Sequence, residues 1–305
     1  MHKQLYLMML KQFPFTPILG WSVSRFDTFS YCKRKYFYSY YGKSDKEFPF
    51  TKISQLKALT SEALTIGSLA HDVIEAILKR LQKSTDVIDE ARMKGFVKAQ
   101  VQKYMLDKVF SEVYYKEKET IDENYIVESV FNAVMIFLSS ERFEWVKQLP
   151  ESSKKQWIIE PGGYGETRIQ TDRGELKAYC KVDFMLPDGK DIYILDWKTG
   201  KADEYKHRKQ LIGYSLFASF HFENKFDRII PILAYLKGEY SEVVPEISQA
   251  DIENFKDDMY AETRAMQQLN RDIENNTPVD KDEFTQTDSE SKCKYCEFRE
   301  LCGRN

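Results

Sequence analysis

The sequence predicts an α/β fold in which a mixed central sheet is flanked by helices. Residues 62 to 82 and about 90 to 148 repeat apolar side chains at helical spacing. After Pro150 the sequence pattern changes to short runs rich in Ile, Tyr and Val, which are typical of strands. Because the 305-residue chain is 42% hydrophobic, it is long enough and apolar enough to bury a substantial core.

The first predicted helix lies in "WSVSRFDTFSYCKRKYFYSYY", with Ser24 as its N-cap and Cys32 on its surface. Within it, "KRKYFYSYY" interleaves three basic residues with five aromatic ones. This composition suits phosphate binding and stacking of exposed bases, and it suits core packing at least as well. Both interpretations therefore stay open for this segment.

An amphipathic helix is predicted over residues 62 to 82. Its apolar stripe consists of Ile66, Leu69, Val73, Ile77 and Leu81. His71 and Glu75 share the opposite face, where Glu75 could reach a metal held by His71 or simply solvate the helix, and solvation is favoured. The charged helical pattern that continues from about 90 to 148 has no Pro or Gly linker at its boundary, so it predicts a helical insertion.

Four strands are expected after Pro150, in "QWIIEP", "ETRIQT", "LKAYCKVDFMLP" and "DIYILDWKT". The turns between them are expected at Gly162-Gly163, Asp172-Arg173-Gly174 and Pro187-Asp188-Gly189. A helix over 204 to 222, a strand in "RIIPILAYLKG" and a charged helix at about 249 to 275 follow. The polar and acidic residues 276 to 291 are expected to form a surface connector.

We expect a single domain over residues 1–305, in four parts. They are 22–60 with the first helix and Cys32, 61–150 with the His71 helix and the insertion, 151–248 with the sheet and its following helix, and 249–305 with the last helix and a cysteine cluster. No apolar run is long enough for a membrane span, and the first ten residues make a poor signal peptide, so a soluble, cytoplasmic protein is expected. The formal charge of −3 restricts any nucleic-acid surface to a local patch.

The strongest chemical signal is "KVDFMLPDGKDIYILDWKTGK". Asp183 is expected to end one strand and Asp196 to lie on the next, so that a hairpin brings both carboxylates to one end. Asp196 and Lys198 share a face because alternate side chains of a strand point the same way. The two carboxylates and the backbone carbonyl of Trp197 could hold Mg²⁺ or Mn²⁺ with open positions for water and a phosphate oxygen. Lys198 could then activate the attacking water and offset charge on phosphorus.

The same D-x-K pattern also occurs as a weak ion pair on an exposed strand. The apolar run "YILDW" favours a catalytic role instead, because it places Asp196 on a buried strand. An unpaired carboxylate there is costly unless it is used. Glu160, at the end of "WIIE", could approach the same site.

Four of the five cysteines lie near the two ends of the chain. Cys293 and Cys296 form a C-x-x-C pair, Cys302 adds a third metal ligand, and Cys32 is the best placed fourth. Disulfides are disfavoured in a reducing compartment, and Cys180 is interpreted as a small buried apolar side chain. Structural zinc stays an alternative, although a zinc ribbon usually offers a second C-x-x-C pair.

The order of four motifs resembles the PD-(D/E)XK nuclease superfamily. They are "GSLAH" at 67–71, "KVD" ending at Asp183, "DWK" at 196–198 and "QLIGY" at 210–214. The chain is most similar to the RecB-like branch, with its CRISPR-associated four-cysteine exonucleases and AddB-type nuclease domains. The resemblance covers about residues 24 to 302, of which 72 to 155 are matched only as a helical insertion, and it implies a restriction-endonuclease-like sheet. One departure is Lys181, where these families usually have glycine.

The resemblance implies a role for each matched residue. His71 would be an additional metal ligand, Asp183 and Asp196 the carboxylate ligands, and Lys198 the base. A pair one helical turn apart, Gln210 and Tyr214, would contact the nucleic acid or position the lysine. Without the resemblance, His71 would be an ordinary surface histidine and the pair an ordinary helix contact. The cysteines would hold a [4Fe-4S] cluster that joins the termini, with Cys32, Cys293, Cys296 and Cys302 as its ligands.

The implied activity is divalent-metal-dependent hydrolysis of DNA, by an exonuclease that acts on single strands in repair, recombination or CRISPR adaptation. A helicase or a CRISPR integrase would be its partner. No G-x-x-x-x-G-K-[ST] phosphate loop occurs, so no helicase half is expected in this chain. The alternative is a catalytically inactive DNA-binding or scaffold subunit with a structural iron-sulfur or zinc site.

Overall fold

The computed structural model describes residues 10–84, 88–160, 165–201, 203–222 and 225–304. Its centre is a five-stranded sheet of order β1-β4-β5-β6-β7. The strands are β1 (Ile158–Ile159), β4 (Phe184–Asp188), β5 (Asp191–Lys198), β6 (Arg228–Lys237) and β7 (Glu239–Val243). β5 and β6 run parallel and the other neighbours antiparallel, so the predicted mixed sheet is confirmed.

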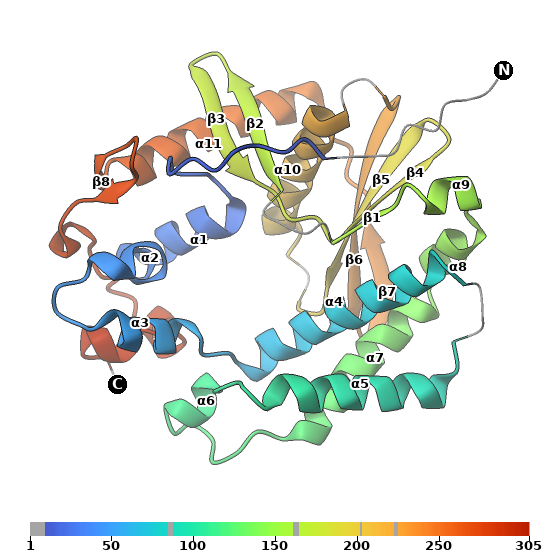
Figure 1. The fold of residues 1–305 in the computed structure, drawn as a ribbon, viewed down its shortest axis with the longest axis horizontal. Helices are drawn as coiled ribbons and strands as arrows, with labels where there is room; N and C mark the ends of the chain where they lie inside the picture. The colour runs from blue at the N-terminus through green and yellow to red at the C-terminus, as the bar shows by residue number, and fades with distance from the viewer. Residues whose placement is uncertain (1–9, 85–87, 161–164, 202, 223–224, 305) are drawn as a thin grey trace.

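A helical layer covers one face of this sheet (Figure 1). It contains α4 (Glu62–Leu81), α5 (Glu90–Met105), α7 (Glu123–Leu138), α8 (Glu141–Gln148) and α9 (Glu151–Lys154). The short α6 (Ser111–Tyr114) follows α5 but lies away from the sheet. The predicted helix over 62 to 82 is therefore confirmed, and Ser61 caps it by accepting from the Leu64 N–H. Leu195 and Trp197 of β5 face this layer, where the Trp197 ring lies 4.9 Å from that of Phe137.

The opposite face of the sheet packs against α10 (Glu204–Phe222). Ile192 and Ile194 of β5 point to this side, together with Leu211 and Phe217 of the helix. Because strand side chains alternate, Asp196 also faces α10 while its neighbour Trp197 faces the helical layer. The alternation thus decides which helix Asp196 meets.

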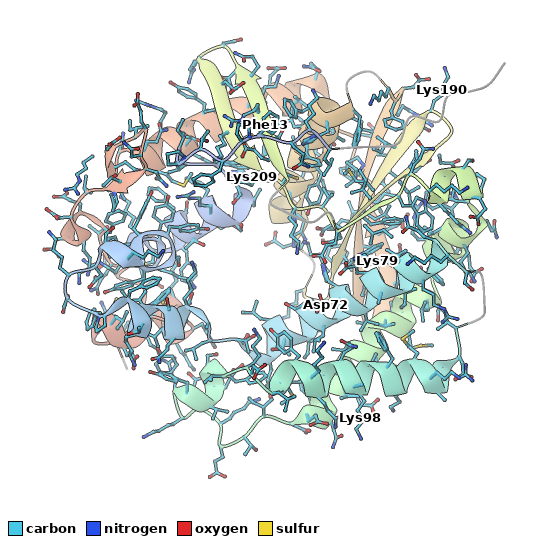
Figure 2. The ribbon with its side chains drawn as sticks, in the orientation of Figure 1. Phe13, Asp72, Lys79, Lys98, Lys190 and Lys209 are labelled. Carbon is cyan, nitrogen blue, oxygen red and sulfur yellow. The ribbon has the colours of Figure 1, made fainter. Side chains whose placement is uncertain are left out.

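A second core lies away from the central sheet and joins segments from both ends of the chain. It is built from α1 (Val23–Tyr31), α2 (Lys33–Tyr41), α3 (Phe50–Lys57), the hairpin of β2 (Glu166–Thr171) and β3 (Gly174–Tyr179), α11 (Gln249–Gln267) and the C-terminal segment with β8 (Asn270–Asp272), β9 (Thr277–Pro278) and α12 (Glu290–Lys294). In Figure 1 the ribbons of this half and of the sheet half form a ring, and the side chains drawn in Figure 2 leave an opening at its centre. α4 and α10 both border that opening.

The start of the chain differs from the prediction. Ser22, and not Ser24, caps the first helix by accepting from the Arg25 N–H. The helix also ends at Tyr31, so Cys32 lies at the extended break between α1 and α2 and not on a helix surface. This break turns Cys32 toward the C-terminal segment, where Tyr31 donates to the Lys292 carbonyl at 2.8 Å.

The predicted strand "LKAYCKVDFMLP" is wrong as a single element. It splits at Cys180 into β3, which pairs with β2 in a separate two-stranded sheet and forms a bridge with Trp21, and β4 of the central sheet. The turn expected at Pro187 begins two residues later, because Pro187 and Asp188 still pair with β5. The turn expected at Gly162-Gly163 lies outside the described residues.

Two further predictions for the C-terminal half are corrected. The helix expected up to about residue 275 ends at Gln267, and the chain continues into β8 and β9. The connector 276 to 291 is not only a surface segment, because Phe284 is fully buried between the rings of α2. Strand β7 has no counterpart among the predicted strands; it returns along β6 after Gly238, whose φ of +78° suits glycine.

The aromatic segment of α2 serves mainly as core. Four of its rings are buried in the second core, those of Tyr36, Phe37, Tyr38 and Tyr41. Tyr40 alone among its five rings is 41% exposed. Stacking on exposed bases is therefore restricted to Tyr40 in this segment. Among the described residues, no helix has the length and apolar content needed to cross a membrane.

Candidate functional site

The two aspartates of the candidate site lie next to each other at one end of the β4–β5 hairpin. Asp183 directly precedes β4, and Asp196 lies near the end of β5, one position beyond the Phe184 and Leu195 pair. The Trp197 N–H donates to Asp183 Oδ2 at 3.1 Å. Both aspartates lie at the same end of the hairpin, as expected. Asp183, however, directly precedes a strand, whereas the sequence predicts that it ends one.

Asp196 is the buried centre of the site, with 2% of its surface exposed. Its Oδ2 atom lies 2.5 Å from Lys198 Nζ. Its Oδ1 atom accepts from Tyr214 OH at 2.5 Å and from Gln210 Nε2 at 3.3 Å. The D-x-K and Q-x-x-x-Y motifs therefore converge on one carboxylate, which their side chains hold in a single orientation.

His71 approaches from α4 on the side of Asp183. Its Nδ1 atom lies 3.3 Å from Asp183 Oδ2, and its Nε2 atom donates to the Trp197 carbonyl at 3.0 Å. The imidazole, the Asp183 carboxylate and the Trp197 carbonyl therefore converge, with Asp196 next to Trp197 on β5, and such a donor set could hold a divalent cation. The orientation of His71 on α4 follows from the apolar stripe of that helix, which packs the opposite side into the core.

Burial and charge shift the pKa values in this site. Burial raises the pKa of Asp196 to about 6; the Asp183 charge adds to this shift, and Lys198 opposes it. Burial lowers the pKa of His71, but hydrogen bonding and attraction to Asp183 outweigh it, so that the pKa lies above its ordinary value. Two carboxylates this close repel each other, and a cation between them would relieve the repulsion.

We expect Mn²⁺ to raise the melting temperature more at about pH 8 than at about pH 5. The folded-state pKa of Asp196 lies above its unfolded value, so ionisation of Asp196 destabilises the metal-free fold as the pH rises. Below about pH 6 a proton on Asp196 competes with the cation. At a concentration about a hundredfold above Kd the shift should be roughly 5 °C. Differential scanning fluorimetry measures it. Equal shifts at both pH values, or an unchanged shift in Asp196→Asn, would contradict the expectation.

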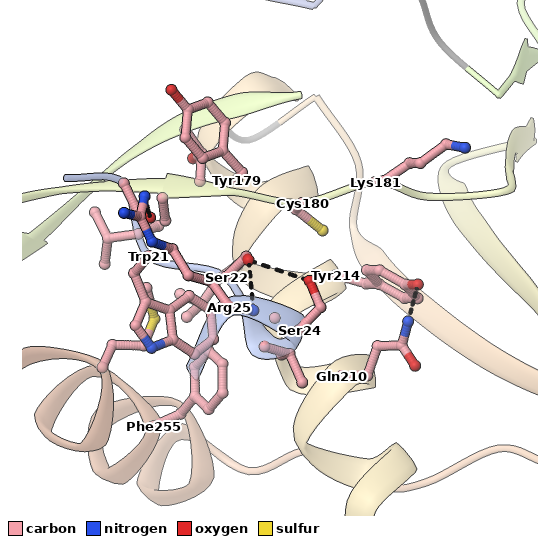
Figure 3. A pocket seen from close by; sticks show the side chains of 18 of the residues that line it. Trp21, Ser22, Ser24, Arg25, Tyr179, Cys180, Lys181, Gln210, Tyr214 and Phe255 are labelled. Atoms are coloured by element: carbon pink, nitrogen blue, oxygen red, sulfur yellow. Dashed lines mark hydrogen bonds between the residues drawn. The ribbon is translucent and has the colours of Figure 1, made fainter. Parts of the chain in front are cut away.

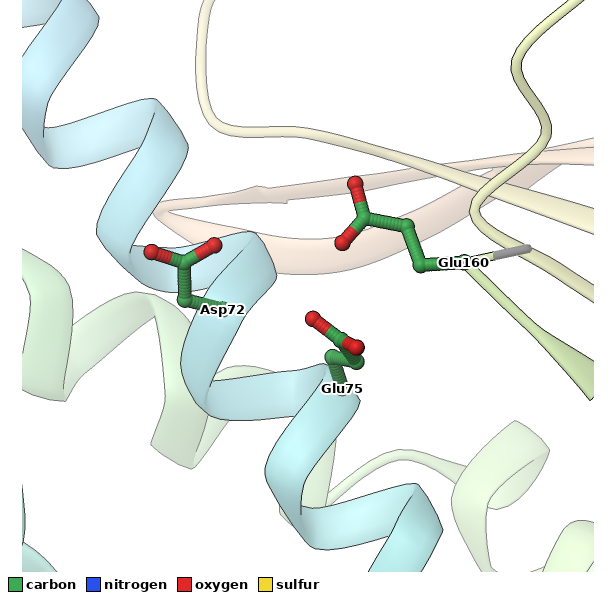
Figure 4. A group of neighbouring side chains, drawn as sticks. All are labelled: Asp72, Glu75 and Glu160. Carbon is green, nitrogen blue, oxygen red and sulfur yellow. The ribbon is translucent and has the colours of Figure 1, made fainter. Parts of the chain in front are cut away.

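A second carboxylate group borders the site (Figure 4). Oxygens of Asp72, Glu75 and Glu160 lie within 4.8 Å of one another, close enough to share one cation. Burial and the charge of Glu160 raise the pKa of Asp72. The sequence interpretation favoured solvation over metal contact for Glu75 and did not include Asp72. Its position one residue after His71, and three before Glu75, is the signal that could have identified it.

This carboxylate group adjoins the predicted metal site directly. A small cavity is lined by His71, Asp183, Glu75 and Glu160 together. Lys181, which departs from the glycine of similar families, forms an ion pair with Glu160. The longer side chain therefore has a carboxylate partner at the edge of the site.

Four cysteines from the two ends of the chain line one small cavity, namely Cys32, Cys293, Cys296 and Cys302. Cys180 lies apart from them, against the α10 side of the sheet. In the described part of the chain, no three cysteine sulfurs lie within 4.8 Å of one another. Tetrahedral zinc with bonds of about 2.3 Å would need sulfurs about 3.8 Å apart. Burial raises the pKa of the Cys296 thiol to about 12, so a bound cation would have to displace its proton.

Comparison with known proteins defines the family. Residues 20–303 match the model described as "PD-(D/E)XK nuclease superfamily". The chain belongs to this superfamily. Membership implies a nuclease that uses a divalent metal and acts on nucleic acid, and the mixed sheet with flanking helices is consistent with a restriction-endonuclease-like fold.

Two other comparisons add little to the superfamily assignment. A solved structure titled "Crystal structure of SSO0001" is similar over 69% of this chain and 96% of its own, with 15% identity and a TM-score of 0.31. A search of curated proteins returns no match. The superfamily match over residues 20–303 spans both halves of the ring.

Proposed function

We propose that the protein is a divalent-metal-dependent DNA exonuclease that acts on single strands, folded as a single domain over residues 1–305. The observation that carries this proposal is the convergence of Asp183, Asp196, Lys198 and His71 at one end of the sheet. Within the described residues, this group combines a buried carboxylate, a neighbouring lysine and a histidine. Metal-assisted hydrolysis of a phosphodiester uses such a set around a cation.

In this proposal His71, Asp183, Asp196 and the Trp197 carbonyl hold the Mg²⁺ or Mn²⁺ ion. The ion supplies Lewis-acid stabilisation of charge that develops on the phosphate. Lys198 orients the attacking water and helps remove its proton, since its Nζ atom is held beside Asp196.

Gln210 and Tyr214 of α10 position Asp196 through its Oδ1 atom. The Gln210 amide also donates to Tyr214 OH at 2.5 Å, so the two side chains act as one unit. Burial raises the pKa of Tyr214 well above its ordinary value, so the phenol stays protonated and continues to donate. We therefore assign these two residues a positioning role.

The ring arrangement supports access by a flexible strand. α4 and α10, which carry His71 and Gln210, both border the central opening, and Figure 2 shows Asp72 at its edge. A single strand is flexible enough to bend into a site inside such a ring, whereas a short DNA duplex is stiff. A helicase or a CRISPR integrase, the partners implied by the RecB-like resemblance, would deliver that strand during repair, recombination or CRISPR adaptation.

We also propose that Cys32, Cys293, Cys296 and Cys302 hold a [4Fe-4S] cluster. Their common cavity, which brings cysteines from both ends of the chain together, supports this proposal. The cluster would supply a covalent cross-link between the N-terminal helices and the C-terminal segment. Iron and acid-labile sulfide analysis of anaerobically purified protein distinguishes it from zinc.

The product ladder from end-labelled DNA tests the proposed activity. With Mg²⁺ or Mn²⁺, single strands labelled at the 5′ or the 3′ end should shorten stepwise from one end, and duplexes should react more slowly. Chelation by EDTA should stop the reaction, because the carboxylates need the cation. Internal products would indicate an endonuclease. Undiminished DNA binding without cleavage under any metal would instead favour a scaffold subunit.

A further inference from the structure

A cavity of about 590 Å³ adjoins the site through Gln210 and Tyr214, the residues that hold Asp196. Figure 3 shows its walls, which come from the first turn of α1, the β2–β3 hairpin, α10 and α11. The volume lies within the range of about 300–1,000 Å³ that is usual for small organic ligands. Its position places any occupant next to the predicted reaction centre.

Two opposed walls of this cavity are apolar. The hairpin contributes Ile169 and Ala178, and the helices contribute Leu216, Phe255 and Met259, all of them buried. An apolar lining that includes the Phe255 ring favours contact with the apolar face of a planar ring. Gly213 also lines the cavity; a Cβ there would lie 3.5 Å from Phe255.

One wall carries an unpaired hydroxyl. Thr167 of β2 is 3% exposed, and its Oγ1 atom has no hydrogen-bond partner among the described residues. It pairs in register with Ala178, so both face the cavity. A buried hydroxyl without a partner is destabilising, and it can both donate and accept. A ligand with a polar edge would satisfy it.

The cavity also has a fixed cation at its rim. Arg25 lies in the first turn of α1, where Nε donates to Tyr36 OH at 3.2 Å and Nη1 donates to the Gly20 carbonyl at 3.3 Å. Its guanidinium lies 4.4 Å from the centre of the Tyr40 ring. The Ser22 cap stands beside it and belongs to the same helix N-terminus, which favours anions. An apolar lining, an unpaired hydroxyl and a cation at the rim together match the base and the phosphate of one nucleotide.

We propose that this cavity binds one unpaired nucleotide next to the scissile phosphodiester. Its base lies between the hairpin and α11 with an edge on Thr167, and its phosphate lies at Arg25 and the N-terminus of α1. This inference rests on the proposed nuclease function and adds a physical basis for strand choice. A base within a duplex is paired and stacked, so it cannot enter the cavity unless it is flipped out.

The test compares Thr167→Val with Thr263→Val, which is a matched control. Thr263 lies on α11, is also 3% exposed and also has an unpaired Oγ1 atom, but it does not line the cavity. Fluorescence anisotropy measures binding of labelled single strands in EDTA, with one abasic position moved along the strand. We expect Thr167→Val to weaken binding of the intact strand about 3- to 10-fold, and Thr263→Val to leave it unchanged.

The abasic strands complete the test. In the wild-type protein one abasic position should weaken binding about tenfold or more, as expected for loss of a stacked base. On that strand Thr167→Val should have no further effect, because its partner is already gone. Equal effects of the two valine variants, or wild-type binding that is insensitive to every abasic position, would overturn the proposal. Because binding is measured without metal, this result is separate from whether DNA is cleaved.

Discussion

Replacing Asp196 with Asn should reduce metal-dependent DNA cleavage about 10³-fold or more, because loss of metal binding removes several kcal/mol of transition-state stabilisation. The fold should survive, since the amide keeps the volume of the buried side chain and can still accept from Tyr214. Cleavage of end-labelled single strands at saturating Mn²⁺ measures the loss, and circular dichroism checks the fold. Activity within tenfold of wild type would rule out Asp196 as a ligand.

Lys198→Ala is the second variant to measure in the same cleavage assay. Loss of a positioned cation at the reacting phosphate should lower kcat about 10²- to 10³-fold. The matched control is Lys201→Ala, the same change at an exposed position three residues further along the chain. Equal activity of the two alanine variants would show that Lys198 serves only as the ion-pair partner of Asp196.

Cys302→Ala should yield colourless and poorly soluble protein. A cluster held by Cys32 and the C-terminal cysteines would close a loop of most of the chain, and the chain-entropy model gives an upper value of about 5 kcal/mol for such a cross-link. Its loss should lower the melting temperature by roughly 10 °C or more. Absorbance of the anaerobically purified protein near 400 nm, its iron content and a thermal melt measure the effect.

Cys180→Ala is the control for this cysteine variant, because Cys180 lies apart from the four-cysteine cavity. It should keep the wild-type iron content and colour. Well-folded, coloured and fully active Cys302→Ala protein would contradict the proposed cluster. If the wild-type protein contained zinc and not iron, the cross-link between the two ends of the chain would remain, but the site would be a zinc site and not an iron-sulfur cluster.

Local periodicity predicted the elements that carry the site. The apolar stripe of 62 to 82 gave α4 within one residue of its observed end, and the run "DIYILDWK" gave β5. In both cases the side chains facing the core repeat at the spacing of the backbone itself. The shared face of Asp196 and Lys198 could therefore be predicted without knowledge of any tertiary contact.

Local patterns failed where pairing partners are distant. The run "LKAYCKVDFMLP" contains no Gly and has its Pro only at the end, so no turn residue marks the break at Cys180 that sends β3 and β4 to different sheets. The buried position of Phe284 was likewise hidden, because its partners Phe37 and Tyr41 lie more than two hundred residues earlier in the chain. Propensity reports how a segment prefers to fold and not what it packs against.

The sequence by itself determined the α/β class, the helix of His71 and the shared face of Asp196 and Lys198, because these depend on the repeat of one segment. Only the tertiary structure decided that Tyr214 donates to Asp196 and that His71 reaches Asp183. It also decided that α1, the β2–β3 hairpin, α10 and α11 enclose a cavity beside them. Such contacts join segments far apart in the chain, and their geometry follows from the packing of whole cores.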